Sequence, residues 1–260
     1  MSLTTKYSAV SHLVQTYLTA LPSILYRTTL SLVFDPRGTQ RFLHQVLNAR
    51  DLECRDSVLE STDIESLLAL QDREVELVGA YYKIRASDTR SLLELACLAA
   101  LVSSLKPTLI FEFGTYIGRT SRLFAKNSPA DTRILTLDLP PDQAGHRIGE
   151  AYVGTPEQVK ITQCYGDSLT FDCSPWFGKV DFVWIDACHE YRYVLSDTKN
   201  ALRLCRPGGW IAWHDYRHSA WWSGVTRCVR ELHRKIPHIC HLYGTTIALL
   251  RVEKQDLANI

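Results

Sequence analysis

The stretch that decides the fold is LIFEFGTYIGRTS, residues 109–121. It begins as a run of apolar residues and breaks into glycines, Gly114 and Gly118, at the point where a helical pattern starts. The carboxylate Glu112 comes two residues before the first of these glycines. A buried strand that runs into a glycine turn and then into a helix is typical of a βα unit in an open parallel sheet.

Six more short apolar runs follow, and helical patterns separate most of them. They are RILTLDL, VKITQC, VDFVWID, GWIAWHD, HICHLY and TTIALLRV, all between residues 133 and 252. Such alternation indicates βα units whose sheet is buried on both faces. We therefore predict an α/β fold, a Rossmann-like, doubly wound, mostly parallel seven-stranded sheet, in a domain of residues 87–260.

The N-terminal third shows irregular helical patterns and no residues that indicate a chemistry. In STDIESLLAL, Thr62 or Asp63 precedes an apolar-periodic run and Glu65 follows closely, which predicts the start of a helix. We assign residues 1–86 to an N-terminal helical extension. Packing within the chain and formation of a homo-oligomer are both open as its role.

The composition is that of an ordinary globular chain whose partners are small molecules. Hydrophobic residues make up 46% and charged residues 22% of the chain, and the net charge is +1. This balance gives no field that would attract nucleic acid, so we expect no nucleic-acid partner. Gln15 and Pro22 interrupt the apolar content between Lys6 and Arg27, and we expect no membrane span.

The eight cysteines are scattered along the chain, with no CxxC pair and no secretory signal ahead of them. Cysteines in such a pattern are typically reduced thiols, most of them in the core. We therefore expect a cytoplasmic protein.

Polar side chains and glycines follow each of the first five predicted strands. In chain order they are Glu112, Gly114 and Gly118; Asp138; Gly166, Asp167 and Ser168; Asp186 and His189; and His214 and Asp215. Open α/β sheets bind their ligands at the carboxyl ends of the strands. A sheet that needed only stability would not require acidic and imidazole groups there, so this edge is the predicted binding site.

The glycine break itself restricts the ligand. A dinucleotide fingerprint would need a second glycine where Tyr116 stands, and no Gly-Lys-Ser/Thr follows to make a phosphate-binding loop. Close backbone approach beside a carboxylate suits an amine-bearing cation such as S-adenosylmethionine (SAM). Asp138, at the end of the next strand, is placed to bind a ribose diol. A tight turn after the strand, with Asp138 as a cap or turn residue, is the alternative.

The successive motifs resemble those of a known family. LIFEFGTYIGRTS, ILTLDLPPD, CYGDS, the segment 180–216 and GVTRCVREL are similar to the motifs of class I SAM-dependent methyltransferases. More narrowly, they resemble the metal-dependent O-methyltransferase branch, which includes catechol, caffeoyl-CoA and macrolide-sugar O-methyltransferases. The most specific parts are D-x-x-H-x-Y from Asp186 and PGGWIAWHDY from Pro207.

The resemblance implies a cofactor-binding set. Its members are Glu112, Gly114, Thr115, Tyr116, Gly118, Thr120, Asp138, Asp167, Ser168 and Asp186. Glu112 and the glycines would line the methionine part of SAM, with Thr120 near its carboxylate. Asp138 would bind the ribose, and Asp167 with Ser168 would lie beside the adenine.

The resemblance also implies a divalent metal, Mg²⁺ or Mn²⁺, bound by Asp186, His214 and Asp215. His214 and Asp215 stand where the family usually has two acidic or amide ligands, and an imidazole favours softer ions such as Mn²⁺, Fe²⁺ or Zn²⁺. Two plainer interpretations stay open. Asp186 could cap the following helix, and His214 could be a buried, hydrogen-bonded residue at a strand end.

His189 and Asp186 are the predicted catalytic residues. His189 follows Asp186 by three residues, and an imidazole suits a general base that takes a proton from a hydroxyl. Related sugar methyltransferases place a histidine at this spacing in that role; a metal ligand or a structural hydrogen bond is the alternative. Asp197 is expected to be a solvated or helix-capping carboxylate.

The acceptor pocket and its lid are less specific predictions. Aromatic residues that could wall the pocket are Trp210, Trp213, Tyr216, Trp221 and Trp222, of which Trp210 resembles a core residue. The segment 140–155 contains Gly145, Gly149 and Gly154 and could act as a substrate lid.

The predicted function is methyl transfer from SAM to a hydroxyl of a small molecule, a secondary metabolite or a sugar, assisted by a divalent metal. One alternative is an N-methyltransferase without metal. Another is a non-catalytic SAM-binding or scaffold protein, because the glycine loop and Asp138 speak for cofactor binding and not for catalysis.

Overall fold

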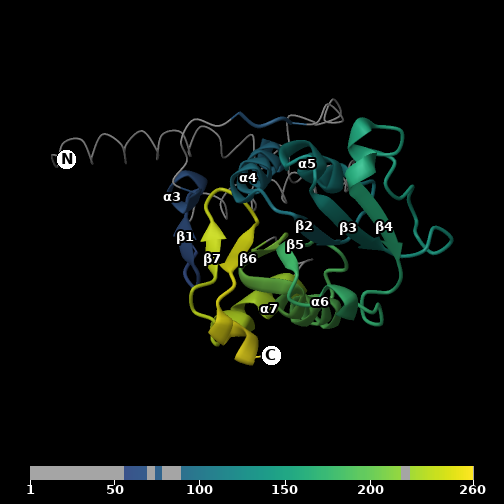
Figure 1. Ribbon diagram of the computed structural model, residues 1–260. Helices are drawn as coiled ribbons and strands as arrows, with labels where there is room; N and C mark the ends of the chain where they lie inside the picture. Colours follow the sequence, from purple (N-terminus) through teal and green to yellow (C-terminus); the bar gives the residue numbers. More distant parts are fainter. Residues whose placement is uncertain (1–55, 69–73, 78–88, 218–222, 260) are drawn as a thin grey trace, which may run out of the picture. The chain divides into compact units, whose positions relative to one another are not determined.

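The computed structural model describes residues 56–68, 74–77, 89–217 and 223–259 (Figure 1). Most of the predicted N-terminal extension, and the loop with Trp221 and Trp222, lie outside these ranges. No helix within the described ranges is long and apolar enough to cross a membrane. The cysteines of these ranges are all free thiols.

The core of the fold is one sheet in the order β1-β7-β8-β6-β5-β2-β3-β4. The strands are β1 (Glu60–Thr62), β2 (Leu109–Phe113), β3 (Arg133–Asp138), β4 (Ile161–Tyr165), β5 (Val180–Ile185), β6 (Cys205–Trp213), β7 (Cys240–Leu242) and β8 (Ala248–Arg251). Strand β8 runs antiparallel to β6 and β7, and the other pairs are parallel. The predicted α/β, mostly parallel fold is confirmed, with eight strands in place of seven.

The additional strand comes from the segment that was assigned to the helical extension. Glu60 pairs with Cys240 and Thr62 with Leu242, so β1 extends the sheet beside β7. Three residues are too few to show the alternation of polar and apolar residues that predicts a strand. At least residues 60–62 therefore belong with the sheet, while a domain boundary between 86 and 87 stays a prediction.

Helices cover both faces of the sheet, α4 and α5 on one and α6 and α7 on the other (Figure 1). The α-helices are α3 (Ile64–Leu68), α4 (Thr89–Leu105), α5 (Arg119–Asn127), α6 (Tyr191–Leu204) and α7 (Ser223–His233). Three short 3₁₀ helices are η3 (Pro156–Lys160), η4 (Ser174–Trp176) and η6 (Lys254–Asn259). The predicted start of α3 is confirmed, because the Asp63 carboxylate accepts a hydrogen bond from the Ser66 backbone amide at 2.7 Å.

Successive residues of the central strands supply two separate cores. In β2, Phe111 and Phe113 pack into the cluster that contains α6 and α7, whereas Ile110 packs into the cluster that contains α4 and α5. Adjacent side chains of a strand point to opposite faces, so a strand with apolar residues on both faces needs cover on both sides. Each fully buried side chain of this size contributes about 1.5–3 kcal/mol.

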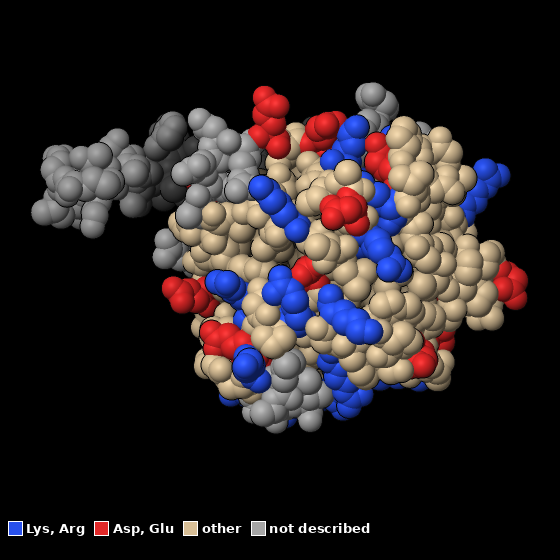
Figure 2. Space-filling view, viewed as in Figure 1, with Lys and Arg blue, Asp and Glu red and all other residues tan. Residues whose placement is uncertain are grey.

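The surface carries charges of both signs. On the face shown in Figure 2, lysine and arginine side chains are interspersed with aspartate and glutamate. This distribution agrees with the net charge of +1.

Candidate active site

A cavity of about 540 Å³ lies at the carboxyl ends of the central strands. Among the residues predicted for the site, it is lined by Gly114, Tyr116, Asp138, Asp167, Ser168, Asp186, His189, His214 and Asp215. These residues come from the loops after β2, β3, β4, β5 and β6. Parallel strands bring their carboxyl ends to one edge, which is why residues so distant in sequence share one cavity.

The glycine loop after β2 lies against the loop after β5. Gly114 has a φ of 93°, and a Cβ there would be 2.1 Å from the carbonyl oxygen of Asp186. The Gly114 amide donates to the Leu137 carbonyl at 2.8 Å, and the Asp186 amide donates to the Phe113 carbonyl at 2.9 Å. Only glycine allows this approach, so Gly114 positions Asp186 at the cavity.

Tyr116 occupies the place where a dinucleotide fingerprint would have its second glycine. Its φ of 48° lies in the left-handed region, which costs a non-glycine residue about 1–2 kcal/mol. Its backbone amide donates to Asp138 Oδ2 at 2.7 Å, and this charge-assisted bond offsets the strain. The loop therefore holds the Asp138 carboxylate at the cavity, where a ribose would bind.

Acidic and imidazole groups gather at the other end of the cavity. One ligand atom each from Asp186, His189 and Asp215 lies within 4.8 Å of the others. His189 Nε2 is 2.6 Å from Asp215 Oδ2. Helix α6 begins only at Tyr191, with Glu190 at its N-cap position, so Asp186 does not cap it. The structure brings Asp186 and Asp215 together with His189 in this cluster, and the predicted metal binding by Asp186, His214 and Asp215 stays a prediction.

Comparison with known proteins agrees with this architecture. Residues 111–216 match a family described as a methyltransferase domain. The match covers less than half of the chain, and over these residues the chain is similar to methyltransferases. Catechol O-methyltransferase B of Danio rerio is 30% identical over 105 residues, which is 39% of this chain and 39% of that protein.

Two solved structures share the fold of this chain. The O-methyltransferase from Bacillus cereus in complex with S-adenosylhomocysteine (SAH) has a TM-score of 0.52 and 18% identity, covering 73% of this chain and 95% of that chain. The SAH-bound Podospora anserina methyltransferase PaMTH1 has a TM-score of 0.51 and 15% identity, covering 74% and 94%.

Glu112 lies behind the cavity and does not line it. It is fully buried, and its Oε2 accepts hydrogen bonds from the Ser121 hydroxyl and, at 2.6 Å, from Thr136. Its Oε1 has no partner. Burial, with a smaller contribution from Asp186 and Asp138, raises the pKa of Glu112 to about 8 although both hydroxyls oppose the shift.

Three other residues of the predicted cofactor set also lie away from the cavity lining. Thr115 is buried, and its hydroxyl is 2.7 Å from that of Thr136. A Cβ at Gly118 would be 2.5 Å from the Tyr152 ring, so this glycine accommodates a protein side chain. Thr120 is half-buried on α5. Their roles toward a cofactor stay predictions.

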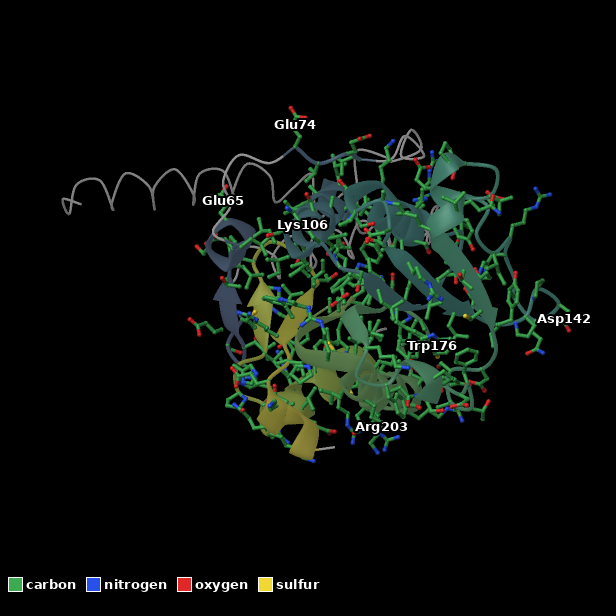
Figure 3. All side chains as sticks on the ribbon, in the orientation of Figure 1. Glu65, Glu74, Lys106, Asp142, Trp176 and Arg203 are labelled. Carbon is green, nitrogen blue, oxygen red and sulfur yellow. The ribbon has the colours of Figure 1, made fainter. Side chains whose placement is uncertain are left out.

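The segment 140–155 is fastened to the glycine loop. The Gly149 amide donates to the Tyr116 carbonyl at 3.0 Å, and the Ala151 amide donates to the Ile117 carbonyl at 2.8 Å. From the same segment His146 lines the cavity, whereas Asp142 projects from the outer margin in Figure 3. The sequence analysis named this segment as a lid but missed His146.

Both ring nitrogens of His214 lie close to carboxylates. Its Nδ1 is 3.1 Å from Asp186 Oδ1, and its Nε2 is 3.2 Å from Glu94 Oε2. Burial opposes the charged imidazolium, but Asp186 and Asp215 outweigh burial and hold the pKa of His214 well above its usual value. Both ring nitrogens of His214 thus lie within hydrogen-bond distance of carboxylates, which agrees with the hydrogen-bonded role that the sequence left open, and its role as a metal ligand stays a prediction.

Glu94, on α4, is a site residue that the sequence analysis missed. Its Oε1 accepts hydrogen bonds from the backbone amide of Thr246 at 2.6 Å and from its hydroxyl at 2.7 Å. Burial alone would raise the pKa of Glu94, but His214 and Thr246 lower it overall. The available signal was one carboxylate within the otherwise apolar run LLELACLAALV.

Two further expectations are wrong. Asp197 is neither solvated nor a cap: it is fully buried on α6 without a regular hydrogen-bond partner, and burial raises its pKa to about 7. The sequence pattern around Asp197 predicts a helix, but it does not indicate which face of that helix packs against the sheet. Trp213, at the end of β6, and Tyr216, in the turn after it, are also fully buried in the core and do not line the cavity.

Proposed function

We propose that the chain is a SAM-dependent O-methyltransferase that methylates a hydroxyl of a small molecule, a secondary metabolite or a sugar, with a divalent metal. One observation carries this proposal. A single cavity has a carboxylate suited to a ribose at one end, Asp138, and a cluster suited to activating a hydroxyl at the other, Asp186 with His189 and Asp215.

At the cofactor end, hydrogen bonds within the chain already orient the Asp138 carboxylate. Asp138 Oδ2 accepts the Tyr116 amide at 2.7 Å, and Oδ1 accepts the Leu139 amide at 2.8 Å. Both oxygens keep further lone pairs, so the two hydroxyls of a ribose can donate to a carboxylate whose orientation is already fixed. Asp167 and Ser168 line the cavity after β4, where the adenine would lie.

At the reacting end, His189 and Asp215 form a base and the group that orients it. With Nε2–H donating to Asp215 Oδ2, the Nδ1 of His189 is the nitrogen that accepts a proton. This nitrogen would take the proton of the acceptor hydroxyl as its oxygen attacks. SAM, when bound, would supply the methyl group, and its in-line transfer to the oxygen would leave a neutral thioether.

The donor set fits a divalent metal. Two carboxylates, Asp186 and Asp215, would hold it, and His189 lies beside them as the base. Carboxylate oxygens suit Mg²⁺ or Mn²⁺. When bound, the ion supplies a Lewis acid that makes the acceptor hydroxyl more acidic.

Methyl transfer without metal, to nitrogen or oxygen, is a second candidate. The hydrogen bond between His214 Nδ1 and Asp186 Oδ1 favours this candidate, because it gives the Asp186 carboxylate a partner in the absence of a metal ion.

Calorimetric titration of the purified chain with SAH tests the proposal. We expect binding, and we expect Asp138→Ala to weaken it about 10- to 100-fold, because hydrogen bonds to a charged group contribute about 1.5–3 kcal/mol. Asp142→Ala, at an exposed carboxylate of the segment 140–155, is the matched control and should bind like the wild type. Folded protein that shows no binding of SAH would contradict the function, and a mass-spectrometric acceptor screen would then identify no methylated product.

A further inference from the structure

We propose that His146 is a further cofactor-binding residue, which donates a hydrogen bond to a ribose hydroxyl that Asp138 also holds. The inference rests on the proposed function and adds a contact to its cofactor end. It assigns the segment 140–155 to binding the ribose.

The observation that carries this inference is a buried ring nitrogen that has no hydrogen-bond partner within the described residues. His146 lines the cavity, and its Nε2 is shielded from solvent and has no hydrogen-bond partner. The same atom is 3.5 Å from Asp138 Oδ2. Buried polar atoms of folded proteins are nearly always paired, so an unpaired one beside a binding residue indicates a ligand.

The chemistry of a ribose hydroxyl matches what the two side chains lack. Asp138 can only accept hydrogen bonds when ionised, so a hydroxyl donates to it and keeps its own lone pairs. His146 supplies the missing donor through Nε2–H. Two atoms 3.5 Å apart can both lie about 2.8 Å from one hydroxyl oxygen placed beside them, and Nε2, which is shielded from solvent, would reach it by a turn of the ring toward the cavity.

The fold places this imidazole at the site. The ring of His146 packs on the ring of Tyr116, with 4.6 Å between the centroids. Tyr116 in turn donates its amide to Asp138, and its carbonyl accepts the Gly149 amide of the segment that carries His146. Carboxylate, glycine loop and segment are therefore linked, and Tyr116 aims both the acceptor and the donor at the cavity.

A plainer explanation is that His146 only neutralises Asp138. That role would affect all ligands of Asp138 alike, whereas a hydrogen bond to one hydroxyl would be lost with that hydroxyl. Ligands that lack single ribose hydroxyls therefore separate the two explanations.

The experiment measures the Kd of SAH, 2′-deoxy-SAH and 3′-deoxy-SAH by calorimetry for the wild type, His146→Ala and His146→Gln. We expect His146→Ala to weaken SAH about 3- to 10-fold, the value of one neutral hydrogen bond, and to leave one deoxy compound unaffected. Gln carries an amide donor of similar reach and should restore part of the affinity. His238→Ala is the matched control, because His238 pairs with Asp256 at 3.1 Å and does not line the cavity.

Three results would overturn the inference. If His146→Ala binds SAH as tightly as the wild type does, His146 makes no hydrogen bond to the ribose. An equal loss for all three ligands would assign His146 to neutralising Asp138. A wild type that binds no SAH would contradict the proposed function itself, whereas the first two outcomes leave that function intact.

Discussion

Replacing Glu112 by glutamine tests the account of the buried carboxyl group behind the cavity. Glu112 is fully buried, its Oε1 has no partner, and its pKa is raised to about 8 by burial and by Asp186 and Asp138. The folded protein therefore holds this side chain neutral at pH 7. Glutamine keeps the shape and the carbonyl that accepts from Ser121 and Thr136, and it cannot ionise.

The sign of the pH dependence follows from proton binding. Between the ordinary pKa of 4.5 and the folded value of about 8, the folded chain binds more protons at Glu112 than the unfolded chain. The stability that this group contributes is therefore present below pH 4.5 and is lost as the pH rises to about 8. At about 1.4 kcal/mol for each pH unit, the free energy of unfolding should fall by up to about 5 kcal/mol over this window.

Urea unfolding of the ligand-free wild type and Glu112→Gln between pH 5 and 9 measures this quantity. We expect the difference in the free energy of unfolding to change by several kcal/mol in favour of the variant, at about 1.4 kcal/mol for each pH unit. The buried amide adds an offset of about 1–3 kcal/mol that does not depend on pH. Glu150→Gln, at an exposed carboxylate, is the control, and its free energy of unfolding should change with pH as that of the wild type does. Parallel curves for Glu112→Gln and the wild type would refute the reasoning.

Two further predictions concern the cluster at the other end of the cavity. Asp186→Asn should weaken Mn²⁺ binding at least about 10-fold in calorimetry and leave SAH affinity nearly unchanged, because it removes a ligand charge and keeps the shape; undiminished Mn²⁺ affinity would contradict the assignment. His189→Ala should lower turnover about 10²- to 10⁴-fold with SAH affinity unchanged. A parallel loss of Mn²⁺ affinity would make His189 a metal ligand, and unchanged turnover would remove it from the mechanism.

The sequence predicts the edge of the sheet well because that prediction depends on one geometric rule. Asp138, Asp186 and Asp215 each stand directly after a buried apolar run, and parallel strands bring such positions together whatever the helices do. The same rule placed Gly114 at the cavity, and it also selected Glu112 and Gly118, which do not line it. It needs only the ends of the strands, which the apolar runs mark clearly.

Partners across the fold could not be predicted in this way. Glu94 lies on a helix that is apolar around most of its circumference, so no periodicity indicates which way its carboxylate points. Its partner His214 is 120 residues away in sequence, and the contact depends on how α4 packs on the sheet. Asp197 shows the same limit, since its helix was predicted and its buried face was not.

The glycines show that residues of a motif also serve contacts within the chain that the sequence does not indicate. Gly114 is required by the carbonyl of Asp186, and Gly118 by the ring of Tyr152, so both serve contacts between loops of this chain. Where the pattern lacks a glycine, Tyr116 accepts a left-handed conformation and carries its ring onto His146. The glycines thus stand where loops of this chain pack closely, and Tyr116, which replaces a glycine of the pattern, lies where the loop lines the cavity.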